Sequence, residues 1–334
     1  MRAEPRTIAE LARALESREV SAVGVTERCL ATIADRDPAL NAFIAVLADQ
    51  ARRQAQQADA EIAAGDVRGP LHGVPISIKD LIDVEGVPTT AASNVRAGHL
   101  ATQDAVVVQR LRAAGAVLIG KTNLHEFALG TTNEDSAFGP VHHPLDRKRS
   151  PGGSSGGSAV SVVTGMAFAS IGTDTGGSIR IPSAACGLVG LKPASGEIPL
   201  DGVVPLSSTL DHVGPMCRSV EDAQMVYDVL RGQTPGTTPS TTPNRESPRG
   251  IRLGVLREYF MELLDPEVAA GFAAACARLR DAGAELRDVA IAHAGEIASS
   301  YLHIVLSEAA TYHATALEQR GDDYTPNVRS RLEM

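Results

Sequence analysis

A run of small residues, Pro-Gly-Gly-Ser-Ser-Gly-Gly-Ser-Ala at positions 151–159, constrains the fold of this chain more than any other feature. Four glycines around adjacent serines allow positive φ angles and a close approach of the backbone to a ligand. A flexible linker could have the same composition, but a linker would not be expected to continue directly into the helix-like, apolar segment Ser158–Met166. We therefore predict an ordered loop with serine side chains at its centre.

Two known motifs overlap this loop, and both fit it poorly. Gly152 and Gly157 have the spacing of a phosphate-binding P-loop, but Ser158 stands where that motif needs lysine. Residues 153–157 also fit G-x-S-x-G, in which Ser155 would be the nucleophile at a strand-to-helix turn. The segment before this motif is rich in charge and histidine, which is not the pattern of a buried strand.

A second serine, Ser178, follows two glycines in Thr-Asp-Thr-Gly-Gly-Ser. This motif comes directly after the apolar, strand-like segment Met166–Gly172, so a nucleophile there would be exposed yet firmly supported. Gly176 and Gly177 would let successive backbone N–H groups converge on one point, as a developing oxyanion requires. A plain glycine turn is the alternative interpretation of these residues.

A serine nucleophile needs a base, and the histidines offer no recognisable triad. His125-Glu126 lacks the second histidine of H-E-x-x-H and is therefore not a zinc motif. Lys79 ends the apolar run that begins at Gly73, where desolvation would lower its pKa and leave a neutral amine. A lysine at the end of a strand is otherwise usually a surface residue. Lys79 is therefore the candidate base.

Together these motifs closely resemble the amidase signature family. The resemblance is carried by residues 72–80 (His-Gly-Val-Pro-Ile-Ser-Ile-Lys-Asp), 151–159, 172–182 and 186–193 (Cys-Gly-Leu-Val-Gly-Leu-Lys-Pro), in this order and spacing. It extends from about residue 8 to residue 230 and is weaker beyond. Several linked motifs make it specific.

The resemblance implies a Ser-Ser-Lys triad and an amidase, a hydrolase of carbon–nitrogen bonds in linear amides rather than peptide bonds. Ser178 would be the nucleophile that carries an acyl-enzyme, Ser154 the bridging serine after a cis peptide bond, and Lys79 the base. Oxyanion-hole or substrate-binding groups would come from the backbone N–H groups of Thr175, Gly176 and Gly177, together with that of Ser178. Asp174 and Arg180 would brace the same loop.

The order of elements predicts an α/β fold, and the resemblance specifies a mixed β-sheet sandwiched between helices. Helices are expected at Ile8–Glu16, Ala22–Ala34, Val46–Ala64, Val106–Ala114 and Pro266–Ala282, and strands at Ala116–Ile119, Ile251–Leu256 and Glu285–Val289. We expect an N-terminal helical layer of the same domain over residues 1–65, an amidase signature core over 66–232, a Thr/Pro-rich loop or linker over 233–249 and an incomplete C-terminal α/β segment over 250–334. Because family members are generally longer, C-terminal truncation is expected.

Composition narrows the classes of partner. With 31 Lys+Arg against 40 Asp+Glu, the formal net charge is −9, which argues against an electrostatically driven nucleic-acid or anionic-membrane surface. No secretory signal is visible, so the cytoplasm is the expected location. The four cysteines form no C-x-x-C pair and are expected to be reduced core thiols. A small-molecule amide is the expected partner, without metal or organic cofactor, and a homo-oligomer is compatible with the sequence.

The resemblance leaves the substrate open. The A subunit of the tRNA-dependent amidotransferase, which hydrolyses glutamine for a partner subunit, is the main alternative to a stand-alone amidase. That subunit usually has an aromatic and a basic residue after Lys192-Pro193, whereas this chain continues Ala-Ser-Gly-Glu-Ile, which favours the stand-alone amidase. A non-catalytic binding protein that retains the fold is a second alternative, and it would be expected to lack a triad residue.

Overall fold

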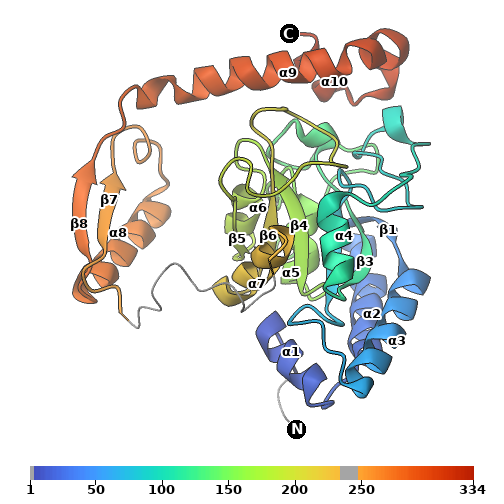
Figure 1. Cartoon of the computed structure of the whole chain (residues 1–334). Helices are drawn as coiled ribbons and strands as arrows, with labels where there is room; N and C mark the ends of the chain where they lie inside the picture. Colours follow the sequence, from blue (N-terminus) through green and yellow to red (C-terminus); the bar gives the residue numbers. More distant parts are fainter. Residues whose placement is uncertain (1–3, 234–246) are drawn as a thin grey trace. The chain divides into compact units, whose positions relative to one another are not determined.

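The computed structural model describes residues 4–233 and 247–334 (Figure 1). Its contacts divide the chain into one unit of Met1–Thr237 with Val305–Met334 and a second unit of Thr238–Ile304. The segment from 305 to the end thus groups with the first unit, unlike the expected division at residue 250. Most of the Thr/Pro-rich tract predicted to be a loop lies outside the described residues.

The elements follow one another along the chain as helices and strands of an α/β protein. The first unit contains α1 (Ile8–Glu16), α2 (Ala22–Leu40), β1 (Phe43–Val46), α3 (Ala48–Ala64), β2 (Pro75–Lys79), η1 (Asn94–Arg96), α4 (Val106–Ala113), β3 (Val117–Thr122), η2 (Glu126–Ala128), α5 (Gly156–Val163), β4 (Ala169–Asp174), α6 (Arg180–Ala185), β5 (Val189–Gly190), β6 (His212–Cys217), α7 (Val220–Leu230), η4 (Gly321–Asp323) and α10 (Pro326–Leu332). The second contains β7 (Arg252–Leu256), α8 (Pro266–Asp281), β8 (Glu285–Val289) and η3 (Ala294–Glu296), and α9 (Ile297–Arg320) spans the boundary between the units.

A six-stranded mixed sheet with the order β1-β3-β2-β4-β6-β5 forms the centre of the first unit. Strand β2 runs parallel to β3 and β4, while β1 is antiparallel to β3, and β6 is antiparallel to β4 and β5. Helices α2 and α3 pack against β3, α5 contacts β2, β4 and β6, and α7 contacts β6 (Figure 1). The predicted α/β fold with a mixed sheet between helices is confirmed.

Local sequence explains where the N-terminal helices begin and end. Thr7 and Glu10 form a reciprocal capping box that starts α1. The predicted helix at residues 22–34 extends further, because Pro38 is tolerated within α2 and the helix stops only at Asn41 in the left-handed conformation. Helix α3 ends at Gly65, whose φ of 89° suits glycine.

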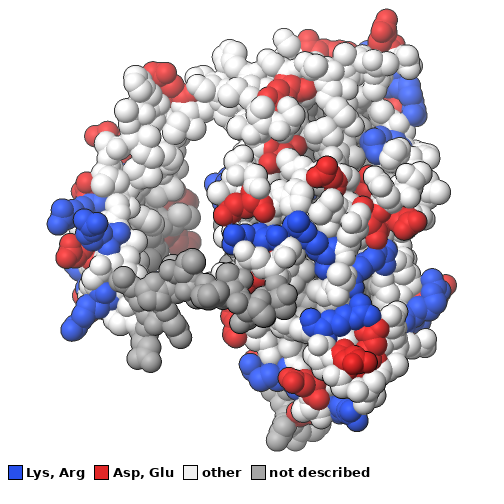
Figure 2. Space-filling model, viewed as in Figure 1, with Lys and Arg blue, Asp and Glu red and all other residues white. Residues whose placement is uncertain are grey.

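The distribution of surface charge and the burial of the cysteines can be compared with what the composition predicted. On the face shown in Figure 2, basic and acidic side chains are interspersed. Cys29, Cys186 and Cys217 are buried free thiols, as predicted, whereas Cys276 is only partly buried. Burial raises the pKa of the Cys29 thiol to about 12. Within residues 4–233 and 247–334, no helix combines the length and apolar character needed to span a bilayer.

Candidate active site

Lys79 is the last residue of β2, and its side chain is completely buried. Strand β4 runs parallel to β2 beside it, so both strands end at the same edge of the sheet. The Lys79 amine donates hydrogen bonds to Ser154 Oγ at 2.8 Å and to Thr173 Oγ1 at 2.7 Å. The fold therefore turns the candidate base away from solvent and towards one of the candidate serines.

Burial gives Lys79 an unusual pKa. Desolvation lowers the pKa of Lys79 to about 7, against an opposing effect of the carboxylates of Asp211 and Asp174. Near neutral pH a large share of this amine is therefore uncharged. A surface lysine, the alternative interpretation of the sequence, is not what the structure contains.

Close packing explains the glycines of the 151–159 loop. A Cβ on Gly153 would lie 2.8 Å from the backbone nitrogen of Asn133, and a Cβ on Gly157 would lie 2.4 Å from two carbonyl oxygens. The peptide bond between Gly153 and Ser154 is cis, as the resemblance implies. Residues 156–163 then form α5. The loop is therefore a tightly packed segment rather than a linker.

Ser155 is buried beside Ser154 but forms a different set of contacts. Its hydroxyl donates to the carbonyl oxygen of Thr173 at 3.2 Å, and its backbone N–H donates to the carbonyl oxygen of Ser178 at 3.3 Å. These bonds tie the loop to β4 and to the segment that follows it. In the described residues, Ser155 has no hydrogen bond to Lys79.

The segment that carries Ser178 connects β4 to α6 and is held by Asp174. The Asp174 carboxylate accepts hydrogen bonds from the N–H of Gly177 at 2.8 Å, the N–H of Ile179 at 3.2 Å and the Arg180 guanidinium at 2.9 Å. Burial alone would raise the pKa of Asp174, but the bonds from Arg180 and the backbone lower it overall. Asp174 and Arg180 thus brace this loop, as expected.

Two of the three predicted triad residues are in direct side-chain contact in the structure. Lys79 and Ser154 are directly hydrogen bonded, whereas Ser178 joins them through the backbone contact with Ser155. Across residues 4–233 and 247–334, no hydrogen bond joins the hydroxyls of Ser154 and Ser178. The N–H groups of Gly176 and Ser178 donate no hydrogen bond within the described chain, but that of Gly177 donates to Asp174.

The predicted set of oxyanion donors is narrowed by these bonds. Since the Gly177 N–H already donates to Asp174, it is the least suitable of the four predicted donors. The Thr175 hydroxyl donates to Asp211 Oδ1 at 2.5 Å, which fixes the side chain and not the backbone N–H. Within the described residues, the N–H groups of Thr175, Gly176 and Ser178 therefore remain as candidate oxyanion donors.

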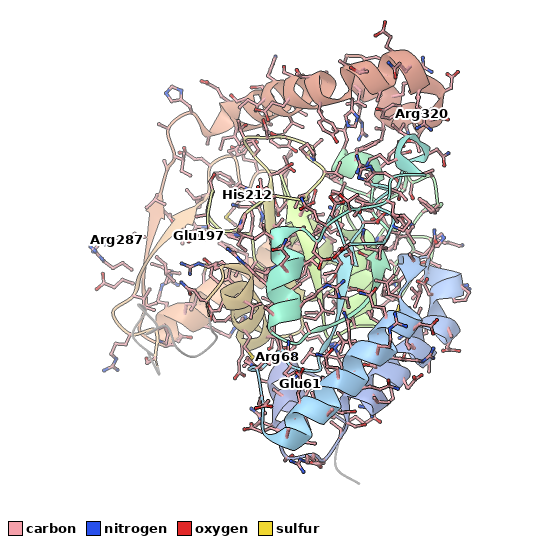
Figure 3. The ribbon with its side chains drawn as sticks, turned by 45° about the vertical axis from the view of Figure 1, so that its right-hand side comes forward. Glu61, Arg68, Glu197, His212, Arg287 and Arg320 are labelled. Carbon is pink, nitrogen blue, oxygen red and sulfur yellow. The ribbon has the colours of Figure 1, made fainter. Side chains whose placement is uncertain are left out.

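Two residues beside this site, half-buried Asp211 and buried His125, were not predicted from the sequence. Asp211 directly precedes β6 and His212, which is labelled in Figure 3. An acidic residue before a strand gives no distinctive signal in a sequence. His125, considered only as part of a failed zinc motif, donates its backbone N–H to the carbonyl oxygen of Ser154 at 3.1 Å. Burial lowers the pKa of His125 to about 4, against the effect of nearby Asp135, so its ring is neutral at pH 7.

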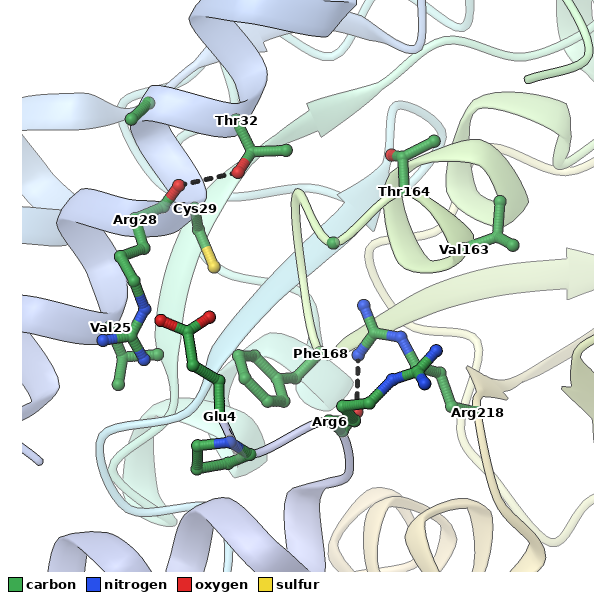
Figure 4. Close-up of a pocket in the computed structure, with 13 residues that line it drawn as sticks. Glu4, Arg6, Val25, Arg28, Cys29, Thr32, Val163, Thr164, Phe168 and Arg218 are labelled. Carbon is green, nitrogen blue, oxygen red and sulfur yellow. Dashed lines mark hydrogen bonds between the residues drawn. The ribbon is translucent and has the colours of Figure 1, made fainter. Parts of the chain in front are cut away.

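A separate pocket of about 460 Å³ is lined by none of these residues (Figure 4). Its walls include Arg28 and Cys29 of α2, Phe168 and Arg218. The Arg218 guanidinium donates to the carbonyl oxygen of Ala167 at 2.8 Å and also to that of Val162, near the end of α5. Packing and helix capping account for Arg218, so this pocket is not the candidate active site.

Among the described residues, no group of three or more His, Cys, Asp or Glu side chains could hold a metal ion.

Comparison with known proteins decides the family. The family described as Amidase matches residues 24–333, which is most of the chain. The chain belongs to the amidase signature family. The A subunit of the glutamyl-tRNA(Gln) amidotransferase of Anaeromyxobacter dehalogenans is 46% identical over 310 residues. A crystal structure of an amidase has a TM-score of 0.89 at 39% identity, and native peptide amidase from Stenotrophomonas maltophilia has a TM-score of 0.82 at 32% identity.

Each match covers a larger share of this chain than of the relative. The alignment with the Anaeromyxobacter protein covers 90% of this chain but 63% of the relative. The two amidase structures match 98% of this chain and cover 73% and 75% of their own chains. The amidase signature chain described here thus spans 63% to 75% of the length of these relatives.

Proposed function

We propose that this protein is an amidase that hydrolyses a carboxamide C–N bond through an acyl-enzyme on Ser178. The observation that carries the proposal is the buried Lys79, whose amine lies 2.8 Å from Ser154 Oγ and whose pKa is lowered to about 7. A buried amine that is partly neutral near pH 7, placed beside a hydroxyl, is the arrangement that general-base catalysis needs. Membership of the amidase signature family supports a hydrolase of C–N bonds.

In the proposed acylation, neutral Lys79 takes the proton of Ser154 as Ser154 takes the proton of Ser178. The Ser178 oxygen then attacks the amide carbon and forms a tetrahedral intermediate. Backbone N–H groups among Thr175, Gly176 and Ser178 stabilise its negative oxygen. Collapse breaks the C–N bond, and the proton returns from Lys79 through Ser154 to the leaving nitrogen.

Water completes the cycle by attacking the acyl-enzyme. The same relay removes a proton from the water and returns it to Ser178 as the carboxylic acid leaves. The Ser178 hydroxyl must approach Ser154 for this relay. Such hydrogen bonds are often long in the absence of substrate and tighten when it binds. The products are a carboxylic acid and ammonia or an amine.

Labelling with a serine-directed fluorophosphonate tests the identity of the nucleophile. Ser178→Ala should abolish labelling, whereas Ser155→Ala should leave it largely in place, because Ser155 bonds to the backbone of Thr173 and not to Lys79. Circular dichroism of each variant checks the fold. Labelling that survives Ser178→Ala and disappears with Ser155→Ala in folded protein would overturn the assignment.

A second candidate, a glutamine-hydrolysing component of a tRNA-dependent amidotransferase, is favoured by the 46% identity to the Anaeromyxobacter protein. Both candidates use the same proposed chemistry and differ in the substrate. Ammonia release should be measured with glutamine, short aliphatic amides and aryl amides. Release from glutamine alone would favour the amidotransferase component, and release from the other amides would favour the stand-alone amidase.

A further inference from the structure

Asp211 is a carboxylate that connects the loop after β4 with the segment before β6. Its Oδ1 accepts the hydroxyl hydrogen of Thr175 at 2.5 Å. Its Oδ2 accepts the backbone N–H groups of Leu206 at 2.8 Å and Ser207 at 3.1 Å. Both oxygens are therefore used, and Thr175 is held three residues before Ser178.

The charge of Asp211 is compensated differently from that of Asp174. Arg180 neutralises Asp174 through two hydrogen bonds of 2.9 Å. Asp211 receives hydrogen bonds from neutral donors, and no arginine, lysine or histidine forms an ion pair with it in the part of the chain that the structure describes. Asp211 is thus a half-buried carboxylate without a cation in direct contact among the described residues.

The buried amine of Lys79 is the cation that Asp211 affects. The carboxylates of Asp211 and Asp174 both oppose the desolvation that lowers the pKa of Lys79. Burial raises the pKa of Asp211, against the hydrogen bonds from Thr175 and the backbone. His125 also lies near Lys79 but is neutral at pH 7. Glu308 accepts a hydrogen bond from the Ser207 hydroxyl, and the N–H of Ser207 donates to Asp211.

We infer that Asp211 is a positioning residue with two separable roles at the active site. Its hydrogen bonds to Thr175, Leu206 and Ser207 fix the loop that presents Gly176 and Ser178, and its carboxylate, which no cation contacts in the described residues, supplies a negative charge that acts on the Lys79 amine. This inference rests on the proposed role of Lys79 as the base. In the cycle, the charge helps Lys79 to hold the proton between its removal from Ser178 and its return to the leaving nitrogen.

Two substitutions separate these roles. Asp211→Asn removes the charge and largely keeps the shape, so the acidic limb of the pH–rate profile should move to lower pH by about one unit. Thr175→Val removes the hydrogen bond and keeps the charge, so the plateau rate should fall about ten- to a hundredfold while the acidic limb stays in place. Thr175→Ser restores the hydroxyl and should recover most of the plateau rate.

Direct titration of Lys79 tests the charge effect without turnover. The chain contains four lysines, at positions 79, 121, 148 and 192, so NMR of lysine-labelled protein gives a simple spectrum. The Lys79 signal is assigned by its loss in Lys79→Ala. The titration midpoint of Lys79 should be lower in Asp211→Asn than in the wild type and unchanged in Thr175→Val.

The outcomes are distinct. An unchanged Lys79 midpoint in folded Asp211→Asn would overturn the charge role, and an undiminished plateau in Thr175→Val would overturn the positioning role. The Thr175 pair decides the positioning role even if Asp211→Asn does not fold. Failure of the proposed function would appear differently, as wild-type protein whose Lys79 titrates as expected but whose Ser178 does not react with the fluorophosphonate.

Discussion

The β2–α5–β4 region and the β7–α8–β8 region both combine parallel strands with a helix, yet they bury their side chains very differently. Every residue of β2 and β4 is buried. Helix α8 and strand β8 have no buried residue, and Val255 is the buried residue of β7. Helices and strands are thus present in both regions, although their burial differs.

The difference shows what burial adds to secondary structure. In the first region, a lysine at the end of a strand loses contact with water, and its pKa falls to about 7. In the second, apolar side chains such as Leu263 remain 97% exposed. The chemistry proposed for this protein therefore depends on the layers packed around the sheet, and the following predictions test this contrast.

The largest expected effect is the loss of the proposed base. Lys79→Ala should slow acylation of Ser178 by about 10²- to 10⁴-fold, because no neutral amine then accepts the proton of Ser154. The rate of fluorophosphonate labelling measures this loss. Lys148→Ala, the same substitution at an exposed position, is the matched control. Equal labelling rates for the two folded variants would exclude Lys79 as the base.

The next largest effect concerns a buried ion pair that involves β3, the strand paired with β2. Lys121 of β3 lies 2.8 Å from the Asp80 carboxylate, and both side chains are almost completely buried. Lys121→Ala should lower the free energy of unfolding by about 3–5 kcal/mol, because it leaves a buried charge unpaired. Urea denaturation measures the change. A second substitution, Asp80→Ala, should recover part of the loss, and additive losses would contradict this explanation.

A purely apolar substitution should cost slightly less. Leu118 of β3 is fully buried in the hydrophobic core. Leu118→Ala should lower the free energy of unfolding by about 2–5 kcal/mol, through lost apolar burial and the cavity left behind. Urea denaturation again provides the measurement. A loss well below this range would mean that the core around β3 collapses into the space.

The next prediction is a smaller effect, the change of the acylation rate for each unit of pH. Protonated Lys79 cannot accept a proton, so its active neutral fraction increases as pH rises through a pKa of about 7. The acylation rate should therefore rise about tenfold per pH unit well below that pKa and level off above it. Labelling rates across this range measure the profile. A rate that falls as pH rises would contradict a neutral-lysine mechanism.

The smallest effect is expected in the exposed region. Leu263→Ala should change the free energy of unfolding by less than about 0.5 kcal/mol, because this side chain is 97% exposed and loses little burial. Leu118→Ala and Leu263→Ala are the same substitution at a buried and at an exposed position. Similar losses at both would show that Leu263 is covered in solution, and the contrast between the regions would disappear.

Much of the fold could be predicted because its signals are local. Helix Ile8–Glu16 and strand Glu285–Val289 have the predicted bounds. A capping box, a glycine stop or an alternating pattern acts within a few residues, so the sequence displays it directly. Strand β1 was not predicted, and its residue Val46 was placed in a helix. Pairing with β3, distant in the chain, decided that segment.

The sequence by itself determined the family and the motifs that carry Lys79, Ser154 and Ser178. Only the tertiary structure placed Lys79 against Ser154 and Thr173, 75 and 94 residues away, and brought Asp211 to Thr175. It also decided that Gly177 donates to Asp174 while Gly176 keeps an undirected N–H. The physical reason is that desolvation and hydrogen-bond partners arise from segments that meet only on folding, and a linear pattern does not specify which segments meet.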